Sequence, residues 1–183
     1  SGTVWTTATS TGLTTTGTQV VNVTNATATA TTVSPGTLSE ANSISFNFTA
    51  GTYALTITAS SAIRSIDFTG FAGAFTIPAT TVYGSWKFST GMTVTPSGAL
   101  SFAATSGNYT ITSSGKSFGV TSITIGSVSP STATWSLMDD INSSTVLTIN
   151  AGTFTTNNYA VTASSLSSNN SNTRTINLGS STV

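Results

Sequence analysis

Large apolar residues alternate with small or polar ones along most of this chain. In residues 65–69, Ile66 and Phe68 flank Asp67, so an extended segment carries two large side chains on one face and the carboxylate on the other. Apolar residues almost never recur at the three- and four-residue spacing of a helix, because Gly, Thr and Ser interrupt every window. The pattern therefore predicts an all-β protein. The other alternating pairs are Phe46/Phe48, Leu55/Ile57, Phe75/Ile77, Trp86/Phe88, Leu100/Phe102, Ile123/Ile125, Trp135/Leu137, Leu147/Ile149 and Ile176/Leu178.

Two architectures are compatible with short strands separated by frequent turns. Clusters of Gly, Pro, Asn and Ser lie between the apolar pairs and predict the turns. Regularly spaced short strands are typical of a β-sandwich, and also of a β-solenoid (parallel β-helix), in which each coil stacks on the preceding one. Residues 65–69 (Ser-Ile-Asp-Phe-Thr) and 85–89 (Ser-Trp-Lys-Phe-Ser) match position for position, which favours the solenoid. We therefore expect short stacked coils, with a β-sandwich as the alternative.

The match between these two segments predicts specific neighbours. In stacked parallel coils, Ile66 would lie under Trp86, and Asp67 would lie beside Lys87 on the outer face. Such an exposed ion pair contributes about 0–1 kcal/mol. By the same register Phe68 would lie under Phe88.

The two parts of the chain differ in composition. Thr and Ala dominate the early part of residues 1–50, where large apolar residues are few. We expect this region to form terminal coils or an arm that exchanges a strand with a neighbouring subunit. Residues 51–183 carry the regular alternation and are expected to form the regular β-solenoid.

Charge is scarce and nearly balanced. The chain has 4 basic and 4 acidic residues, together 4% of the sequence, whereas soluble domains have about 25%. Four cations cannot neutralise a run of phosphates, and no apolar stretch approaches the roughly 18 residues of a membrane helix, so neither nucleic-acid binding nor membrane insertion is expected. The absence of cysteine excludes a disulfide framework. A surface rich in Thr, Ser and Asn indicates an extracellular, cell-surface or virion protein.

Both ends of the chain resemble strands without polar caps. The chain starts at Ser1 without Met, as expected of a processed product or an excised segment, and Val4 and Trp5 follow at once. Near the other end, Ile176 and Leu178 continue the alternation almost to the terminus. An exposed coil edge is a template for further strand pairing. We therefore expect an assembly interface that includes Val4, Trp5, Ile176 and Leu178, and a homo-oligomer or filament as the product.

Several longer segments carry a resemblance to a group of proteins. The segments at 66–73, 83–94, 100–107 and 170–179, and the opening at 2–5, are similar to recurring phrases of long, repetitive, Thr/Ser/Gly-rich β-solenoid-like proteins of phage and bacterial genomes. In those proteins the closing phrase is followed by one like the opening, so this chain resembles one permuted repeat. The resemblance implies a virion appendage, tail-fibre-like protein or surface adhesin, and it brings no catalytic residues.

Residues suited to catalysis or metal binding are few. Without His or Cys, imidazole bases, the common triads and zinc sites are excluded. Polysaccharide-degrading solenoids use paired carboxylates, but Asp139 and Asp140 are adjacent and in a strand would point to opposite faces. In a turn, Asp139, Asp140 and Asn142 would be candidate ligands for Ca²⁺, although an ordinary polar turn is the simpler interpretation. We expect no enzymatic activity and, apart from this possible Ca²⁺, no cofactor.

The aromatic residues fall into two predicted groups. Most lie inside alternating strands, which indicates core packing rather than stacking on sugars. Phe71 and Phe75 lie close to Gly70 and Gly73, and turns there would push their rings outward into an exposed apolar patch. The residues considered for sugar stacking are Trp5, Tyr53, Trp86, Tyr109, Trp135 and Tyr159.

These observations lead to one functional hypothesis and one alternative. The chain is expected to be a non-enzymatic structural subunit of an extracellular fibre, filament or virion appendage, which associates with itself through open β ends. The alternative is a glycan- or receptor-binding module of an adhesin or tail fibre, which requires exposed aromatic and Asn or Asp side chains on one face.

Overall fold

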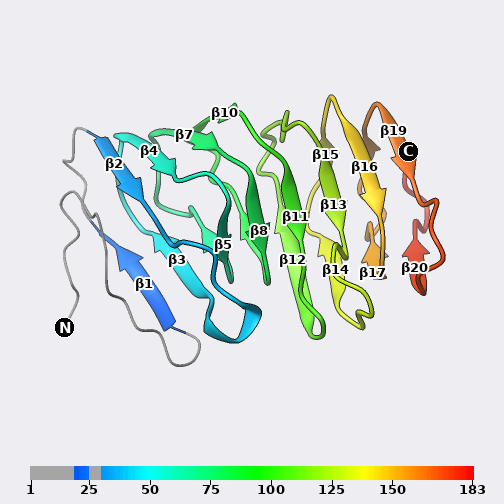
Figure 1. Cartoon of the computed structure of the whole chain (residues 1–183). Coiled ribbons are helices and arrows are strands. Elements are labelled where there is room, and N and C mark those ends of the chain that lie inside the picture. The colour runs from blue at the N-terminus through cyan, green and yellow to red at the C-terminus, as the bar shows by residue number, and fades with distance from the viewer. Residues whose placement is uncertain (1–18, 25–29) are drawn as a thin grey trace.

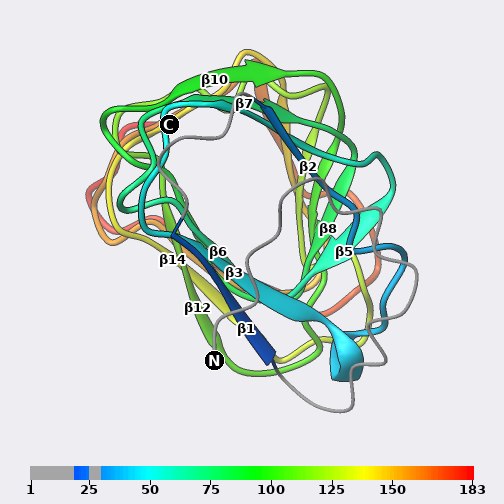
Figure 2. The same ribbon diagram turned by 90° about the vertical axis from the view of Figure 1, so that its left-hand side faces the viewer.

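The chain folds as a parallel β-solenoid of about seven turns, as Figure 1 shows. This computed structural model describes residues 19–24 and 30–183. All the strand pairs within this part are parallel, and its one helical element is the short 3-10 turn η1 (Glu40–Asn42). Viewed from the N-terminal end, the coils superimpose into a single ring whose sides are the sheets (Figure 2). The prediction of stacked β-coils is therefore confirmed, and the β-sandwich alternative is wrong.

Two long sheets follow the length of the solenoid. The eight-stranded sheet contains, in spatial order, β1 (Gln19–Val23), β3 (Ile44–Phe48), β6 (Ile66–Asp67), β9 (Trp86–Lys87), β12 (Asn108–Thr112), β14 (Thr134–Leu137), β17 (Gly152–Thr155) and β20 (Arg174–Asn177). The six-stranded sheet contains β5 (Ser61–Ile63), β8 (Thr80–Val82), β11 (Leu100–Phe102), β13 (Ile123–Ile125), β16 (Val146–Ile149) and β19 (Ser165–Ser167).

The third side of the solenoid is divided between two short sheets. The first contains β2 (Ala30–Val33), β4 (Ala54–Ile57), β7 (Ala74–Ile77) and β10 (Thr93–Pro96). The second contains β15 (Ile141–Asn142) and β18 (Val161–Thr162). Strands β1, β2 and β3 fall in residues 1–50, and they pair within the same sheets as the later strands.

The stacking predicted for residues 65–69 and 85–89 is present. Ile66 pairs with Trp86, and Asp67 pairs with Lys87. The Lys87 ammonium lies 3.7 Å from the Asp67 carboxylate, and both side chains are well exposed. The rings of Phe68 and Phe88 stack with their centroids 6.2 Å apart.

A column of phenylalanine rings forms the centre of the core. Phe48, Phe68, Phe88 and Phe118 come from successive coils, and neighbouring centroids lie 5.1, 6.2 and 5.1 Å apart. All four rings are at most 1% exposed. Because each coil alone would expose its apolar side, the stacking of neighbours supplies the burial that stabilises each coil.

The prediction of an exposed patch at Phe71 and Phe75 is wrong, because both rings are buried, with 1% and 0% exposure. Phe71 turns inward at its corner and packs against Tyr53, with centroids 5.3 Å apart. Phe75 lies on the inward face of β7, 4.7 Å from the ring of Phe68. Gly70 allows the corner to approach the coil below closely, since a Cβ there would lie 1.8 Å from the carbonyl oxygen of Thr49.

On the third side of the solenoid, the four-stranded sheet ends at β10. Pro96 ends this strand and has no N–H to donate to a following strand. Phe118 enters the core from the irregular segment of the next coil, and its ring lies 5.1 Å from that of Phe88. This segment rejoins the third side of the solenoid through Ser117, which bridges to Asn142 at the start of the two-stranded sheet.

Candidate assembly interface

The C-terminal end of the solenoid presents strand edges. In the described part of the chain, β20 and β19 are the last strands of their sheets, and no described strand pairs with their outer sides. Figure 1 shows both strands at the end opposite to β1. Ile176, predicted as an interface residue, lies on the inward face of β20 and is half-buried, as is Leu178 just after the strand. Val4 and Trp5 lie outside the described residues.

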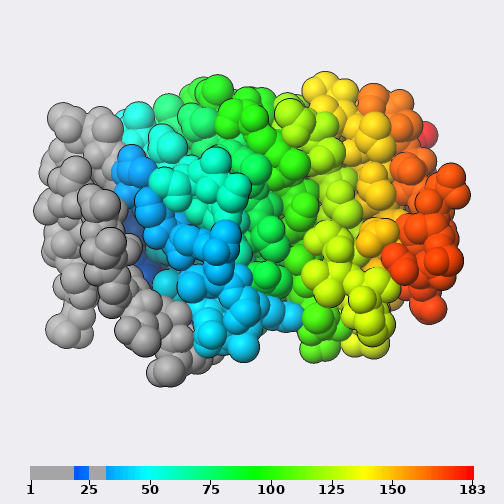
Figure 3. Space-filling model, in the orientation of Figure 1, coloured from blue at the N-terminus to red at the C-terminus, as the bar shows by residue number. Residues whose placement is uncertain are grey.

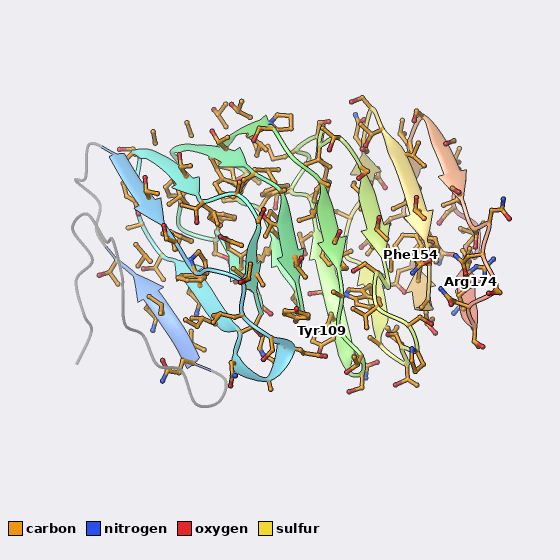
Figure 4. The ribbon with its side chains drawn as sticks, viewed as in Figure 1. Tyr109, Phe154 and Arg174 are labelled. Carbon is orange, nitrogen blue, oxygen red and sulfur yellow. The ribbon has the colours of Figure 1, made fainter. Side chains whose placement is uncertain are left out.

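Ile176 continues an apolar column that runs through four strands. Tyr109 pairs with Trp135, Trp135 with Phe154, and Phe154 with Ile176. Figure 4 shows Tyr109 and Phe154 along this side of the solenoid. Ile176 is half-buried whereas Phe154 is completely buried, because the described part of the chain places no further coil on Ile176. Leu166 ends the six-stranded sheet in the same way, since it pairs with Leu147 on one side and is half-buried.

The third side of the C-terminal end is partly covered by the chain itself. The Val161 N–H in β18 donates to the carbonyl oxygen of Thr182, 2.8 Å away, and Val161 is 3% exposed. The uncovered apolar surface at this end therefore lies over β19 and β20.

Arg174 holds the last corner of the solenoid in place. Its guanidinium donates to the carbonyl oxygen of Asn170 at 2.9 Å, to the Asn170 Oδ1 at 3.0 Å and to the carbonyl oxygen of Asn172 at 2.7 Å. It also donates to the carbonyl and hydroxyl oxygens of Ser168. Figure 4 shows Arg174 at the C-terminal end. Nη1 contacts three of these acceptors, and Nε and Nη2 each donate to Ser168, so this cation fixes the loop from Ser168 to Asn172.

Asparagine side chains connect successive coils beside this loop. The Asn150 Oδ1 accepts hydrogen bonds from the Nδ2 of Asn170 at 3.0 Å and of Asn172 at 3.3 Å. The Asn150 Nδ2 donates to the carbonyl oxygen of Gly126 in the preceding coil, at 3.0 Å. The sequence shows the Asn residues at 150, 170 and 172, but only the register reveals that they meet.

The predicted calcium ligands bind backbone groups of neighbouring coils. The Asp139 carboxylate accepts hydrogen bonds from the N–H groups of Ser113 and Ser114, at 2.7 and 2.5 Å, in the preceding coil. The Asp140 carboxylate accepts one from Ala160 N–H at 2.8 Å in the following coil.

Asn142 is exposed and pairs with Thr162. The described residues contain no group of three or more His, Cys, Asp or Glu suited to a metal ion. Calcium binding stays a prediction, and the observed contacts give both carboxylates a role in joining coils.

The other two carboxylates also have partners within the chain. Asp67 pairs with Lys87, and its Oδ1 accepts hydrogen bonds from the N–H and hydroxyl of Thr69. The Glu40 carboxylate accepts a hydrogen bond from the Thr105 hydroxyl at 2.8 Å, 65 positions further along the chain. The loop around η1 therefore extends along the solenoid and fastens to a later coil.

Exposed aromatic side chains are scarce in the described part of the chain. Tyr53, Trp86 and Trp135 are buried, as their positions in alternating strands predict. Tyr109 is half-buried, and its hydroxyl donates to the carbonyl oxygen of Ser106 at 2.9 Å. Tyr159 is 38% exposed and lies after a turn. The cluster of exposed rings that a glycan-binding face requires is not found among the described residues.

The outer faces carry columns of small polar side chains. Figure 3 shows the surface as successive bands in chain order. On the C-terminal half of the eight-stranded sheet, the register forms two such columns, and sequence reasoning did not detect them because threonine occurs nearly everywhere. One column is Asn108, Thr134, Thr153 and Thr175, and the other is Thr110, Ser136, Thr155 and Asn177.

Comparison of the chain with protein-family models, with curated proteins and with solved structures gives no match. No helix within the described ranges 19–24 and 30–183 has the length and apolar character needed to cross a membrane. The functional argument therefore depends on the fold, its ends and its surface.

Proposed function

We propose that the chain is a non-enzymatic structural subunit of an extracellular fibre, filament or virion appendage, which associates with itself through the ends of its solenoid. The observation that carries this proposal is the pair of strand edges at β19 and β20, each beside a half-buried apolar residue.

A second copy of the same chain is the partner that fits these strand edges. All strand pairs within the described residues are parallel, so both ends of each sheet have the same strand direction. A copy translated along the solenoid axis would therefore extend the sheets without reversing a strand. Ile176 and Leu166 would then gain the apolar neighbour that Phe154 and Leu147 already have. A head-to-tail contact of this kind does not close on itself and produces a filament.

The low charge of the chain supports close association. The net charge is zero, so long-range repulsion between copies is small. The cation nearest the C-terminal edge, Arg174, donates its hydrogen bonds to oxygens of its own loop, so its guanidinium is held within the chain. The carboxylates are likewise engaged with the chain's own groups, which supports a structural rather than a catalytic role.

Charge placed on the C-terminal edge tests this proposal. We expect wild-type protein to grow into larger species with rising concentration in sedimentation velocity, and Ile176→Lys and Leu166→Lys to remain monomeric, because an ammonium cannot be buried against the next coil. Val146→Lys is the matched control, since Val146 is exposed on the side of the solenoid. Far-UV circular dichroism and thermal melting confirm that each variant is folded.

Two results would overturn end-to-end association. One is that both edge variants, folded, associate as the wild type does. The other is that Val146→Lys alone prevents association, which would locate the contact on the side of the solenoid.

A further inference from the structure

One face of the solenoid carries a two-dimensional array of hydroxyl groups. We call it the hydroxyl face; it consists of the outward residues of β12, β14, β17 and β20. Each strand contributes two outward positions separated by one inward residue, and the three strand pairs are in uninterrupted register. The positions, strand by strand, are Asn108 and Thr110, Thr134 and Ser136, Thr153 and Thr155, and Thr175 and Asn177.

Most of these hydroxyls have no partner in the described part of the chain. Thr134, Ser136, Thr153 and Thr175 make no side-chain hydrogen bond there, and Thr155 accepts one long contact of 3.4 Å from Asn177. Elsewhere the chain uses hydroxyls to join coils, as between Ser131 and the carbonyl oxygen of Ala104. The hydroxyls of this face are therefore available to an external ligand.

The hydroxyl face has no charged side chain among its eight positions. Arg174 belongs to β20, but it shares the inward orientation of Ile176 and its guanidinium binds the loop from Ser168 to Asn172. Asp67 and Lys87 lie on the same sheet but on the earlier strands β6 and β9, where they pair with each other.

The array is regular and is supported from behind. Neighbouring strands in a sheet lie about 4.8 Å apart, and alternate residues on one strand repeat at roughly 6.6 Å, so the hydroxyls define a lattice with these two spacings. Tyr109, Trp135, Phe154 and Ile176 lie between the outward positions and point inward, and the middle two are completely buried. Packed side chains of this kind hold the strands in place.

We propose that the hydroxyl face binds ice, a ligand that goes beyond the structural role proposed above. The oxygen atoms on a prism face of hexagonal ice repeat in two dimensions, with one spacing close to the strand separation and the other somewhat longer than that of alternate residues, whereas a small soluble molecule has no such repeat. Threonine presents a hydroxyl that joins the water lattice and a methyl group that fits between its oxygens. The absence of charge avoids tightly held hydration shells that would disturb that lattice.

A crystalline polysaccharide is the rival ligand with a comparable repeat. Proteins recognise sugar rings largely by stacking them on exposed aromatic side chains. The rings of this sheet point inward, and only Tyr109 among them is half-exposed, with its hydroxyl bound to Ser106. The observations therefore favour ice.

The test uses a single substitution at the centre of the array. We expect the full-length wild-type chain to inhibit ice recrystallisation and to shape ice crystals in a nanolitre osmometer. Thr153→Lys should lose both effects, because an ammonium at the centre prevents flat contact with the lattice. Thr76→Lys is the matched control, since Thr76 is an outward threonine at mid-strand on β7, in a different sheet, and it should retain both effects. Circular dichroism melting verifies that both variants are folded.

Three outcomes would overturn the proposal. The wild-type chain could leave ice growth unchanged, folded Thr153→Lys could act as the wild type does, or Thr76→Lys alone could lose the effect. The wild-type chain is also mixed with crystalline cellulose and chitin, and sedimentation with either solid in the absence of any effect on ice would assign the face to polysaccharide. Loss of filaments in Ile176→Lys without loss of ice binding would separate this site from the assembly interface.

Discussion

Buried polar atoms without a hydrogen-bond partner reduce the stability of the folded protein. The Tyr53 hydroxyl is buried and has no hydrogen-bond partner among the described residues, and the indole N–H groups of Trp86 and Trp135 share this condition. A buried polar group without a partner destabilises the folded state by about 1–3 kcal/mol. Burial also raises the pKa of Tyr53 above its ordinary value of about 10, because desolvation disfavours the phenolate.

Tyr53→Phe should stabilise the protein. The substitution removes the unpaired hydroxyl and keeps the ring contact with Phe71, so we expect the free energy of unfolding to rise by about 1 kcal/mol in chemical denaturation. Tyr109→Phe is the matched control and should be neutral or slightly destabilising, because the Tyr109 hydroxyl has a partner in Ser106.

The same substitution should change the response to alkaline pH. Since the folded-state pKa of Tyr53 exceeds the unfolded value, the unfolded state loses its proton first, and wild-type stability falls as pH rises above about 10. This contribution should be absent from Tyr53→Phe, so its stability should fall less steeply over that range. Parallel curves for the two proteins would contradict the assignment.

At the residue scale, the sequence predicted side-chain neighbours correctly where two matched segments occupy equivalent positions in successive coils. The position-for-position match of residues 65–69 and 85–89 predicted that Ile66 would stack with Trp86. It also predicted the ion pair between Asp67 and Lys87. It failed at Phe71, because the direction of a side chain at a corner depends on how closely the neighbouring coil approaches. The role of Asp139 was also missed, since its N–H partners lie in another coil.

Among the elements, the corners decide how closely the coils can stack. Gly70 lies where the backbone passes over Thr49 of the coil below, and a Cβ there would lie 1.8 Å from a carbonyl oxygen that cannot move easily. The turn could be predicted from the glycine, but the close approach could not, because it involves two segments that are distant in sequence. The change of sheet after Pro96 was likewise not predicted, as it depends on Phe118 entering the core from the next coil.

Gly70→Ala should destabilise the solenoid. Relieving the contact with Thr49 requires a backbone shift, and overpacking of this kind costs about 1–3 kcal/mol, measurable by denaturant unfolding. Gly91→Ala provides the control at the next corner, because a Cβ there would meet the Cβ of Ala72 at 3.2 Å and its Cα at 3.7 Å, and would not come as close to backbone as at Gly70. Equal effects of the two substitutions would show that close approach is not what Gly70 permits.

The whole molecule behaves as a stack in which each coil contacts its neighbours. The pairs of Phe46 with Ile66, and of Ile66 with Trp86, repeat one register through three coils. The sequence predicted this repeat because it contains two closely matched segments. It did not predict the three-sided cross-section or the hydroxyl face, since these depend on how all the coils align.

Removal of one complete coil should leave a folded protein. Deletion of residues 65–84 places Trp86 on Phe46 in the register that Ile66 now occupies, so we expect a β-rich circular dichroism spectrum and cooperative melting at a lower temperature. Deletion of residues 65–74 is the control, because half a coil destroys the register and should prevent folding. Similar spectra and melting for the two deletions would contradict a stack of equivalent coils.

The most direct test of end-to-end association is electron microscopy of the purified chain, in low salt and in physiological buffer. The proposed association through β19 and β20 predicts filaments in both buffers, because Leu166 and Ile176 on these strands are apolar, with an axial repeat equal to the length of one solenoid. Dispersed single particles in both buffers would contradict self-association as the function of this fold.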